Sequence, residues 1–214
     1  MSFVLYGYWR SGTSYRTRIA LNLKGLAYEQ APLDLRAGGH RANAYLALNP
    51  QGLVPALATP GGVLIQSPAI LEWLEETVPS PPLLPGEPFA RAQVRAMAAI
   101  VACDIHPLNN LRVLKALKGE LSASDVQVAA WTARWIHAGF AALEPLIERH
   151  GRGFAWGDAP TLADCCLVPQ IYSARRFEVD LAPFPRVVAA GERAADHPAF
   201  AAAHPDRQPD AEAA

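Results

Sequence analysis

The first 35 residues alternate between short apolar runs, which are typical of strands, and one stretch whose apolar positions have helical spacing. A strand is predicted over residues 3–8 and a second over residues 28–35. Between them, apolar side chains fall near one side of a helix over residues 14–24, and Gly25 is a natural stop for it. The chain is therefore predicted to begin with the order β-α-β.

After a connecting stretch, the pattern returns to short apolar runs. Residues 53–58 and 62–66 flank the turn Thr59-Pro60-Gly61-Gly62, which predicts a hairpin. A helix over residues 69–77 follows, with Ser67 as its N-cap and Pro68 at its first position. The order β-α-β and then β-β-α is typical of a thioredoxin-like α/β domain.

Five prolines within residues 79–88 indicate a break in the chain, because such a segment sustains neither a helix nor an inner strand. We predict a thioredoxin-like domain over residues 1–80, a linker over 81–87 and an all-helical domain over 88–214.

Helical patterns fill the second half. Long helical stretches are predicted over residues 87–118, interrupted at His106-Pro107, and over 125–150. Thr161-Leu162-Ala163-Asp164 is a capping box that opens a buried helix through residue 173. Short helices are expected over 184–194 and 198–202, and the tail from Pro205 is expected to fray.

Composition and charge narrow the class of protein. Of 214 residues, 51% are hydrophobic and 18% charged, and the net charge of −1 excludes a general nucleic-acid or membrane-surface binder. The chain has three cysteines, Cys103, Cys165 and Cys166, and no CxxC motif. This odd number indicates neither a disulfide framework nor a zinc site, and it favours a location in the reducing cytoplasm. We expect neither a signal peptide nor a membrane-spanning segment.

Several segments, in order along nearly the whole chain, resemble the zeta class of glutathione transferases. Trp9-Arg10-Ser11-Gly12-Thr13-Ser14, followed by Arg16-x-Arg18-Ile19-Ala20-Leu21, resembles the class signature. Residues 49–57 resemble the segment that carries a cis-proline, residues 65–70 the γ-glutamyl site, and residues 161–164 and 174–181 two later motifs. The resemblance implies the glutathione transferase fold, glutathione as cofactor and a homodimer.

The chain departs from the class pattern at the first helix. Gly12 stands where the class usually has Ser, and Thr13 where it usually has Cys, so no role of the class cysteine carries over. This Ser-Gly-Thr-Ser form and residues 103–110 are similar to bacterial maleylpyruvate isomerases rather than maleylacetoacetate isomerases.

The turn that contains Ser11 and Thr13 is the first candidate catalytic site. Its N–H groups and hydroxyls lie at a predicted helix N-terminus, where the dipole favours an anion such as a glutathione thiolate. The residues alone fit a plain N-cap cluster equally well, and the resemblance favours the thiolate site. Ser11 is the preferred donor and Thr13 its rival.

The resemblance implies further glutathione contacts. A cis bond before Pro55, which only about 5–6% of X–Pro bonds adopt, would expose the Val54 backbone to the cysteinyl part. Gln66 and Ser67 are expected at the γ-glutamyl carboxylate, where Ser67 fits a plain N-cap as well. His40 and Gln51 are candidates for the glycine end.

Arginines are the candidates for the substrate, because a maleyl keto acid carries two carboxylates that guanidinium groups bind by paired hydrogen bonds. The resemblance favours Arg10, Arg112 with the neighbouring Asn110, and Arg176, for which Arg175 is the alternative. His106 is a candidate to polarise the substrate or contact glutathione, or it marks a helix kink. Asp104 is expected either at the γ-glutamyl amine across a dimer interface or as a solvated acid.

The implied reaction is the glutathione-dependent cis–trans isomerisation of maleylpyruvate to fumarylpyruvate in gentisate-type aromatic catabolism. A maleylacetoacetate isomerase, a general conjugating transferase and a non-catalytic binding module are the alternatives. The binding module predicts lost hydroxyls at the first turn, whereas Ser11 and Thr13 are both present.

Overall fold

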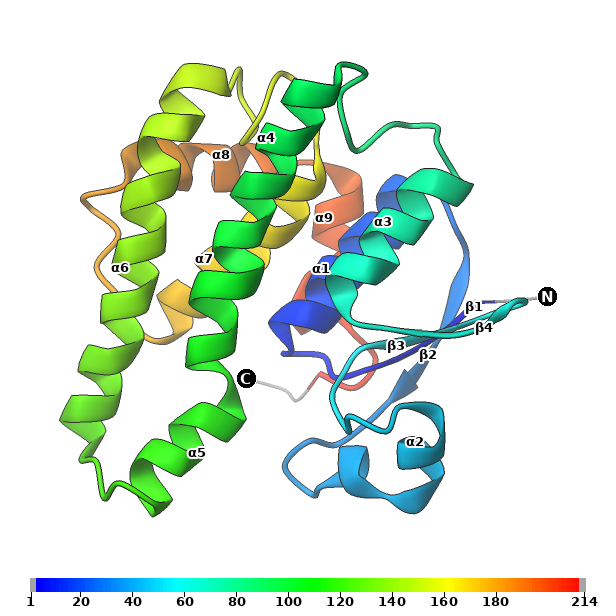
Figure 1. The fold of residues 1–214 in the computed structure, drawn as a ribbon, viewed down its shortest axis with the longest axis vertical. Helices are drawn as coiled ribbons and strands as arrows, with labels where there is room; N and C mark the ends of the chain where they lie inside the picture. Colours follow the sequence, from blue (N-terminus) through cyan, green and yellow to red (C-terminus); the bar gives the residue numbers. More distant parts are fainter. Residues whose placement is uncertain (1–2, 212–214) are drawn as a thin grey trace. The chain divides into compact units, whose positions relative to one another are not determined.

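The predicted strands of the first part of the chain pair into one mixed sheet (Figure 1). The computed structural model describes residues 3–211, and within them the sheet has four strands in the order β2-β1-β3-β4. The strands are β1 (Phe3–Gly7), β2 (Tyr28–Pro32), β3 (Ala56–Thr59) and β4 (Gly62–Ile65). β1 is parallel to β2 and antiparallel to β3, and β3 and β4 form the predicted hairpin. The thioredoxin-like order is confirmed.

Helices cover both faces of this sheet. α1 and α3 lie side by side on one face, and α2 lies on the other (Figure 1). The helical elements here are α1 (Gly12–Leu23), η1 (Gly39–Arg41), α2 (Asn43–Leu48), α3 (Ser67–Thr77), α9 (Pro198–Ala203) and η4 (Pro205–Arg207). Ile19, Leu57 and Leu74 are fully buried in the core, and burial of such a side chain stabilises the fold by about 1.5–3 kcal/mol.

The chain divides into two compact units, and the first of them resumes near the C-terminal end. It runs to Leu83 and continues from Asp196, and the second unit covers the residues between. Nε of the buried Arg18 donates to the Ala203 carbonyl at 3.0 Å, which ties α9 to α1. The division predicted at the linker assigned α9 to the other domain, because an apolar pattern does not show which partner a short helix packs on.

The segment after α9 is ordered as well. The Asp210 carboxylate accepts the Trp9 N–H at 3.0 Å, and the Gln208 side chain is 6% exposed. The expectation of a frayed tail is therefore wrong for residues 205–211, because these polar contacts bind it to the start of α1. Residues 212–214 lie outside the described part of the chain.

A buried ion pair holds the proline-rich linker to the first unit. Lys24 Nζ lies 2.6 Å from a Glu75 carboxylate oxygen and donates to the Pro81 carbonyl at 2.7 Å. The same carboxylate oxygen accepts the Leu83 N–H at 2.9 Å. The two charged side chains are 0% and 5% exposed, so the removal of one of them would leave the other charge poorly compensated.

The second unit is helical in the part that the structure describes, apart from one isolated bridge between Gly151 and Gly157. α7 packs on α4 and α8, and α6 packs on η2 and α8. The elements are α4 (Pro88–Ala99), η2 (Ile100–Ile105), η3 (His106–Asn109), α5 (Leu111–Gly119), α6 (Asp125–His150), α7 (Leu162–Arg176) and α8 (Pro185–Ala195).

The long helix predicted before residue 118 is interrupted earlier than expected. It changes to a π-helical turn, η2, at Ile100, six residues before the expected interruption at His106. Gly139 on α6 allows this turn to approach closely, because a Cβ atom there would lie 2.2 Å from Ile105 Cδ1. Pro107 cannot donate an N–H, so the chain continues as a 3-10 turn.

The predicted capping box of α7 is confirmed. The Thr161 hydroxyl accepts the Ala163 N–H at 3.2 Å, and the Asp164 carboxylate accepts the Thr161 N–H at 2.8 Å and the Ala155 N–H at 2.7 Å. Burial raises the pKa of Asp164 to about 6, against the lowering effect of these hydrogen bonds. The helix continues to Arg176, three residues beyond the predicted end.

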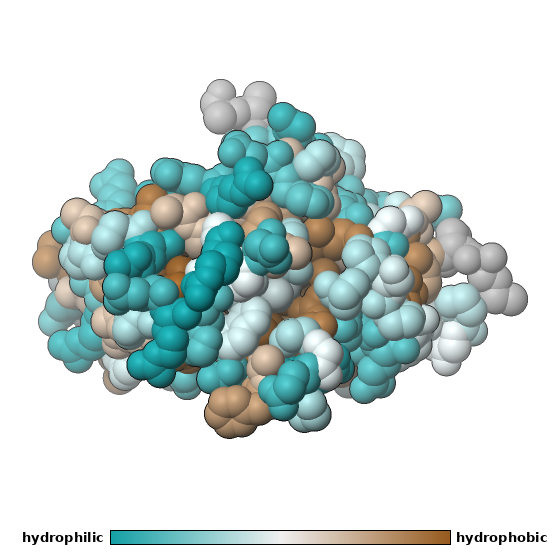
Figure 2. Space-filling view, turned by 90° about the horizontal axis from the view of Figure 1, so that it is seen from above, coloured by the Kyte–Doolittle hydropathy of each residue, from teal (hydrophilic) through white to brown (hydrophobic). Residues whose placement is uncertain are grey.

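Figure 2 shows a face on which hydrophilic residues predominate, with hydrophobic residues scattered between them. Isolated exposed apolar side chains of this kind are normal for a globular surface. Among residues 3–211, no helix combines the length and the apolar character that crossing a membrane requires.

Candidate functional site

A chain of hydroxyl groups lies at the N-terminus of α1. Ser11 is the N-cap, and its Oγ accepts the Ser14 N–H at 3.3 Å. The Ser11 and Thr13 hydroxyl oxygens are 2.9 Å apart, and the Thr13 hydroxyl donates to the Val54 carbonyl at 2.9 Å. Because the single Thr13 hydroxyl proton is directed at Val54, the Ser11 hydroxyl is the donor between the two. Ser11 is thus the hydroxyl whose proton can turn to a bound anion without releasing Val54.

The turn itself is fixed to the end of β1. The Ser11 N–H donates to the Tyr8 carbonyl at 3.0 Å, and the Ser14 hydroxyl accepts the Tyr8 N–H at 3.3 Å. Gly7 leaves room for this contact, since a Cβ atom there would lie 3.0 Å from Ser14 Oγ. The strand and the helix therefore hold the Ser11 hydroxyl from both sides.

The loop before β3 contains the cis Val54–Pro55 bond that the resemblance implied. Its shape is held by the Leu53 carbonyl, which accepts from the Tyr45 hydroxyl at 2.6 Å and from Asn49 Nδ2 at 2.7 Å. Burial raises the pKa of Tyr45, so this hydroxyl stays a donor. Within residues 3–211 the Val54 N–H has no hydrogen-bond acceptor, which leaves a backbone donor for an extended ligand.

The predicted γ-glutamyl residues meet at the start of α3, but not as expected. The N-cap position is Gln66, in a left-handed conformation with φ of 68°, and it makes no side-chain cap. The Ser67 hydroxyl instead accepts from Arg16 Nη1 at 3.1 Å. The prediction of Ser67 as N-cap is therefore wrong, because the guanidinium occupies its oxygen, and Pro68 is the second residue of the helix.

The loop between η1 and β3 brings the remaining predicted glutathione residues close to each other. Gln66 Nε2 donates to Gln51 Oε1 at 2.6 Å. Gly52 has a φ of 61°, and a Cβ atom there would lie 3.2 Å from the His40 carbonyl. His40 is half-buried in η1. The three residues Gln51, Gln66 and His40 thus lie around one loop.

Arg10 lies next to the hydroxyl chain in the sequence. Its guanidinium carbon stands 5.0 Å from the centre of the Trp9 ring, a cation–π distance. The contact keeps the guanidinium beside the turn.

The second unit carries the other candidates. Asp104 is exposed in the π-helical turn, and His106 is half-buried at the start of η3. Asn110 is the N-cap of α5, and its side-chain oxygen accepts the Arg112 N–H at 3.2 Å. Arg112 borders a hollow of about 400 Å³ together with Trp131 and apolar residues of α5.

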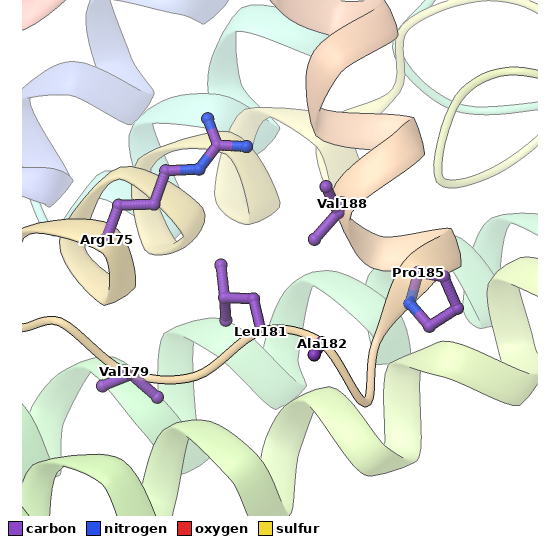
Figure 3. A pocket seen from close by; sticks show the side chains of 6 residues that line it. All are labelled: Arg175, Val179, Leu181, Ala182, Pro185 and Val188. Carbon is purple, nitrogen blue, oxygen red and sulfur yellow. The ribbon is translucent and has the colours of Figure 1, made fainter.

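The structure separates the two neighbouring arginines at the end of α7. Arg175 forms an ion pair with Glu192 at 3.4 Å and borders a pocket of about 520 Å³ (Figure 3). The other lining residues of this pocket are Val179, Leu181, Ala182, Pro185 and Val188. The Arg176 guanidinium stands 4.2 Å from the centre of the Phe177 ring. Arg175 is therefore engaged with α8 at the surface, whereas the Arg176 guanidinium packs on the Phe177 ring.

Sequence reasoning missed Arg16 and Asn49. Neither looks chemical in the sequence, since an arginine in a helix and an asparagine before a proline are usually solvated. Both residues are distinguished by their burial, since Arg16 is 2% and Asn49 0% exposed. Burial of a polar residue becomes visible only in the folded structure.

Comparisons with known proteins agree with this geometry. The family described as "Glutathione S-transferase, N-terminal domain" matches residues 1–76. The chain is 54% identical to a maleylpyruvate isomerase from Ralstonia sp, over 96% of this chain and 98% of that protein. It is 53% identical to a maleylacetoacetate isomerase from Pseudomonas aeruginosa, over 98% and 99% of the two chains.

A solved structure gives the class. It is described as holo maleyl pyruvate isomerase, a bacterial glutathione S-transferase of the zeta class, and it superposes with a TM-score of 0.95. Its sequence is 52% identical, with 98% of this chain and 100% of that chain covered. The protein therefore belongs to the zeta class of the glutathione transferase family.

Proposed function

We propose that this protein is a glutathione-dependent cis–trans isomerase that converts maleylpyruvate to fumarylpyruvate. The observation that carries the proposal is the hydroxyl chain from Ser11 through Thr13 to the Val54 carbonyl, next to a Val54 N–H that has no acceptor in residues 3–211. Together they offer donors for a thiolate and for the backbone of an extended peptide. The two isomerases of about the same identity support the reaction type.

The residues present fit glutathione as the cofactor. The Val54 edge suits its cysteinyl part, the start of α3 suits a carboxylate, and Gln51 and His40 lie at the loop beyond. When bound, glutathione would supply the thiolate nucleophile that reversible addition to an activated cis double bond requires.

The side chains of this protein have three tasks in the proposed mechanism. The Ser11 hydroxyl turns from Thr13 to the sulfur and stabilises its negative charge. Arg10, Arg112 and Arg176 bind the substrate carboxylates, which fixes the double bond relative to the thiol. His106 donates to the keto oxygen, where negative charge develops during the reaction.

Maleylacetoacetate is the alternative substrate, since a maleylacetoacetate isomerase is 53% identical. The Ser-Gly-Thr-Ser turn favours maleylpyruvate. Measuring kcat/KM for both compounds with the same enzyme preparation tests the assignment. A higher value for maleylacetoacetate would reverse it.

Arg176→Ala, with Arg175→Ala as the matched control, tests the substrate role on adjacent residues. We expect Arg176→Ala to lose isomerisation and keep glutathione binding, while Arg175→Ala keeps both, because Arg175 pairs with Glu192. Loss of glutathione binding in Arg176→Ala, with the circular dichroism spectrum unchanged, would contradict the role.

We also infer a cytoplasmic homodimer in which Asp104 contacts the γ-glutamyl amine. Cys165 and Cys166 are buried and form no disulfide within residues 3–211, which suits a reducing compartment. Light scattering of the purified protein tests the dimer. A monomer at micromolar concentration that isomerises at the full rate would contradict both the dimer and the role of Asp104.

A further inference from the structure

Arg16 on α1 is a buried cation that lacks a carboxylate partner in the described residues. It is 2% exposed, and its only hydrogen bond within residues 3–211 runs from Nη1 to the Ser67 hydroxyl at 3.1 Å. Its Nε is also buried, without an acceptor in this part of the chain. A guanidinium stays protonated in proteins, so the positive charge persists.

Lys24, the C-cap residue of α1, is a buried cation that has a carboxylate partner. Lys24 has the Glu75 carboxylate at 2.6 Å and a carbonyl at 2.7 Å. Isolated burial of a charge is unfavourable, and Arg16 has only a neutral hydroxyl against it. The free protein therefore carries an electrostatic cost at Arg16 that an incoming anion would relieve.

The hydroxyl that Arg16 contacts belongs to Ser67, the first residue of the 11-residue helix α3. The N-terminus of this helix has no side-chain cap. The N–H groups of its first turn and its dipole favour an anion there. Because the Ser67 oxygen accepts from Arg16, the Ser67 proton is free to be donated outward. The buried guanidinium and the uncapped helix start are two independent features that favour the same negative charge.

We propose that Arg16 is a positioning residue whose buried positive charge compensates the negative charge of the γ-glutamyl α-carboxylate of glutathione, acting through the Ser67 hydroxyl. The inference rests on the proposed function, which supplies glutathione as the ligand. It adds a buried countercharge to a subsite whose other groups are neutral: a hydroxyl, an amide side chain and backbone N–H groups.

The two roles that Arg16 could have predict opposite effects on the free protein. Arg16→Met keeps most of the side-chain volume and removes the charge. If Arg16 acts on the ligand, the free variant unfolds at the same or a higher temperature, because replacing a poorly compensated buried charge by an apolar group is often neutral or stabilising. If Arg16 is a structural element alone, the variant unfolds at a lower temperature.

Calorimetric titration with two peptides isolates the carboxylate. The first is glutathione, and the second is γ-aminobutyryl-cysteinyl-glycine, which lacks only the α-carboxylate of the γ-glutamyl group. We expect Arg16→Met to weaken glutathione binding by about 10- to 100-fold, the loss expected for a charged hydrogen-bonded contact, and to leave binding of the second peptide nearly unchanged. Arg16→Lys should restore part of the preference for glutathione, and the exposed Arg36→Met should not alter it.

An unchanged preference for glutathione over the second peptide in Arg16→Met would overturn the inference, as would a lower unfolding temperature with equal losses for both peptides. Those results would leave the proposed function standing. Failure of the wild-type protein to bind glutathione would overturn the proposed function and this inference together.

Discussion

The order of protons in the hydroxyl chain predicts that Ser11 and Thr13 contribute unequally to the thiolate. Thr13 donates to the Val54 carbonyl and Ser11 donates to Thr13. A bound thiolate can therefore take the Ser11 hydroxyl proton from Thr13, whereas the Thr13 hydroxyl proton stays on the Val54 carbonyl. Ser11→Ala therefore removes the donor to the sulfur, and Thr13→Val removes a neutral contact that holds the loop.

The magnitudes follow from this difference. A hydrogen bond to a charged group is worth about 1.5–3 kcal/mol and a neutral one about 0.5–1.5 kcal/mol. At about 1.36 kcal/mol per unit, Ser11→Ala should raise the pKa of the bound glutathione thiol by about one to two units. Thr13→Val should leave the thiol pKa unchanged or lower it slightly, since Ser11 then keeps its proton for the sulfur alone.

The assay is a titration of thiolate ultraviolet absorbance in the glutathione complex, together with the pH dependence of kcat. Thr17→Val is the matched control, because the Thr17 hydroxyl donates within α1 to the Thr13 carbonyl at 3.0 Å and is buried. We expect no change in the thiol pKa for this control. A larger pKa rise in Thr13→Val than in Ser11→Ala would refute the proton order and make Thr13 the donor.

Three further predictions concern the scaffold. Lys24→Met should lower the free energy of unfolding in urea by about 3–5 kcal/mol, because it leaves the buried Glu75 carboxylate without its cation; a loss below about 1 kcal/mol would mean that the pair acts like a surface pair. The Asp164 carboxyl group binds its proton more tightly in the folded protein than in the unfolded chain, with a pKa of about 6 against 3.8. The stability of the wild type relative to Asp164→Asn should therefore be greatest below pH 4 and fall by about 3 kcal/mol as the pH rises through 6. A stability difference that does not vary with pH in urea titrations would contradict the buried-acid assignment. Gly139→Ala should lower the thermal unfolding midpoint, because the added Cβ would lie 2.2 Å from Ile105 Cδ1 and overpack the π-helical turn, at a cost of about 1–3 kcal/mol. An unchanged midpoint in calorimetry would show that the turn can shift to accept the methyl group without loss of stability.

The elements with local signals could be predicted from the sequence. The strands, the hairpin and the 26-residue helix α6 follow from apolar period and turn residues, and the Thr161–Asp164 box fixes the start of α7. The cis bond before Pro55 could not be derived this way, because bond statistics favour trans, and only the family resemblance indicated it.

The features that depend on contacts between distant residues escaped prediction. The π-helical turn Ile100–Ile105 depends on the room that Gly139 leaves, 34 residues after Ile105 in the chain. Packing of α9 on α1 depends on Arg18, and the free outward proton of Ser67 depends on Arg16. An arginine gives no sign in the sequence of whether it will be buried, so these parts of the fold and the site became visible only in three dimensions.

The measurement that tests the central claim most directly is the number of maleylpyruvate molecules converted per molecule of glutathione. Glutathione is supplied at a small fraction of the substrate concentration, fumarylpyruvate formation is followed spectroscopically, and free thiol is determined at the end. The account predicts many turnovers per glutathione with all thiol recovered, and no turnover without it. Thiol consumed in step with the substrate would show a conjugating transferase instead and would contradict the isomerase assignment.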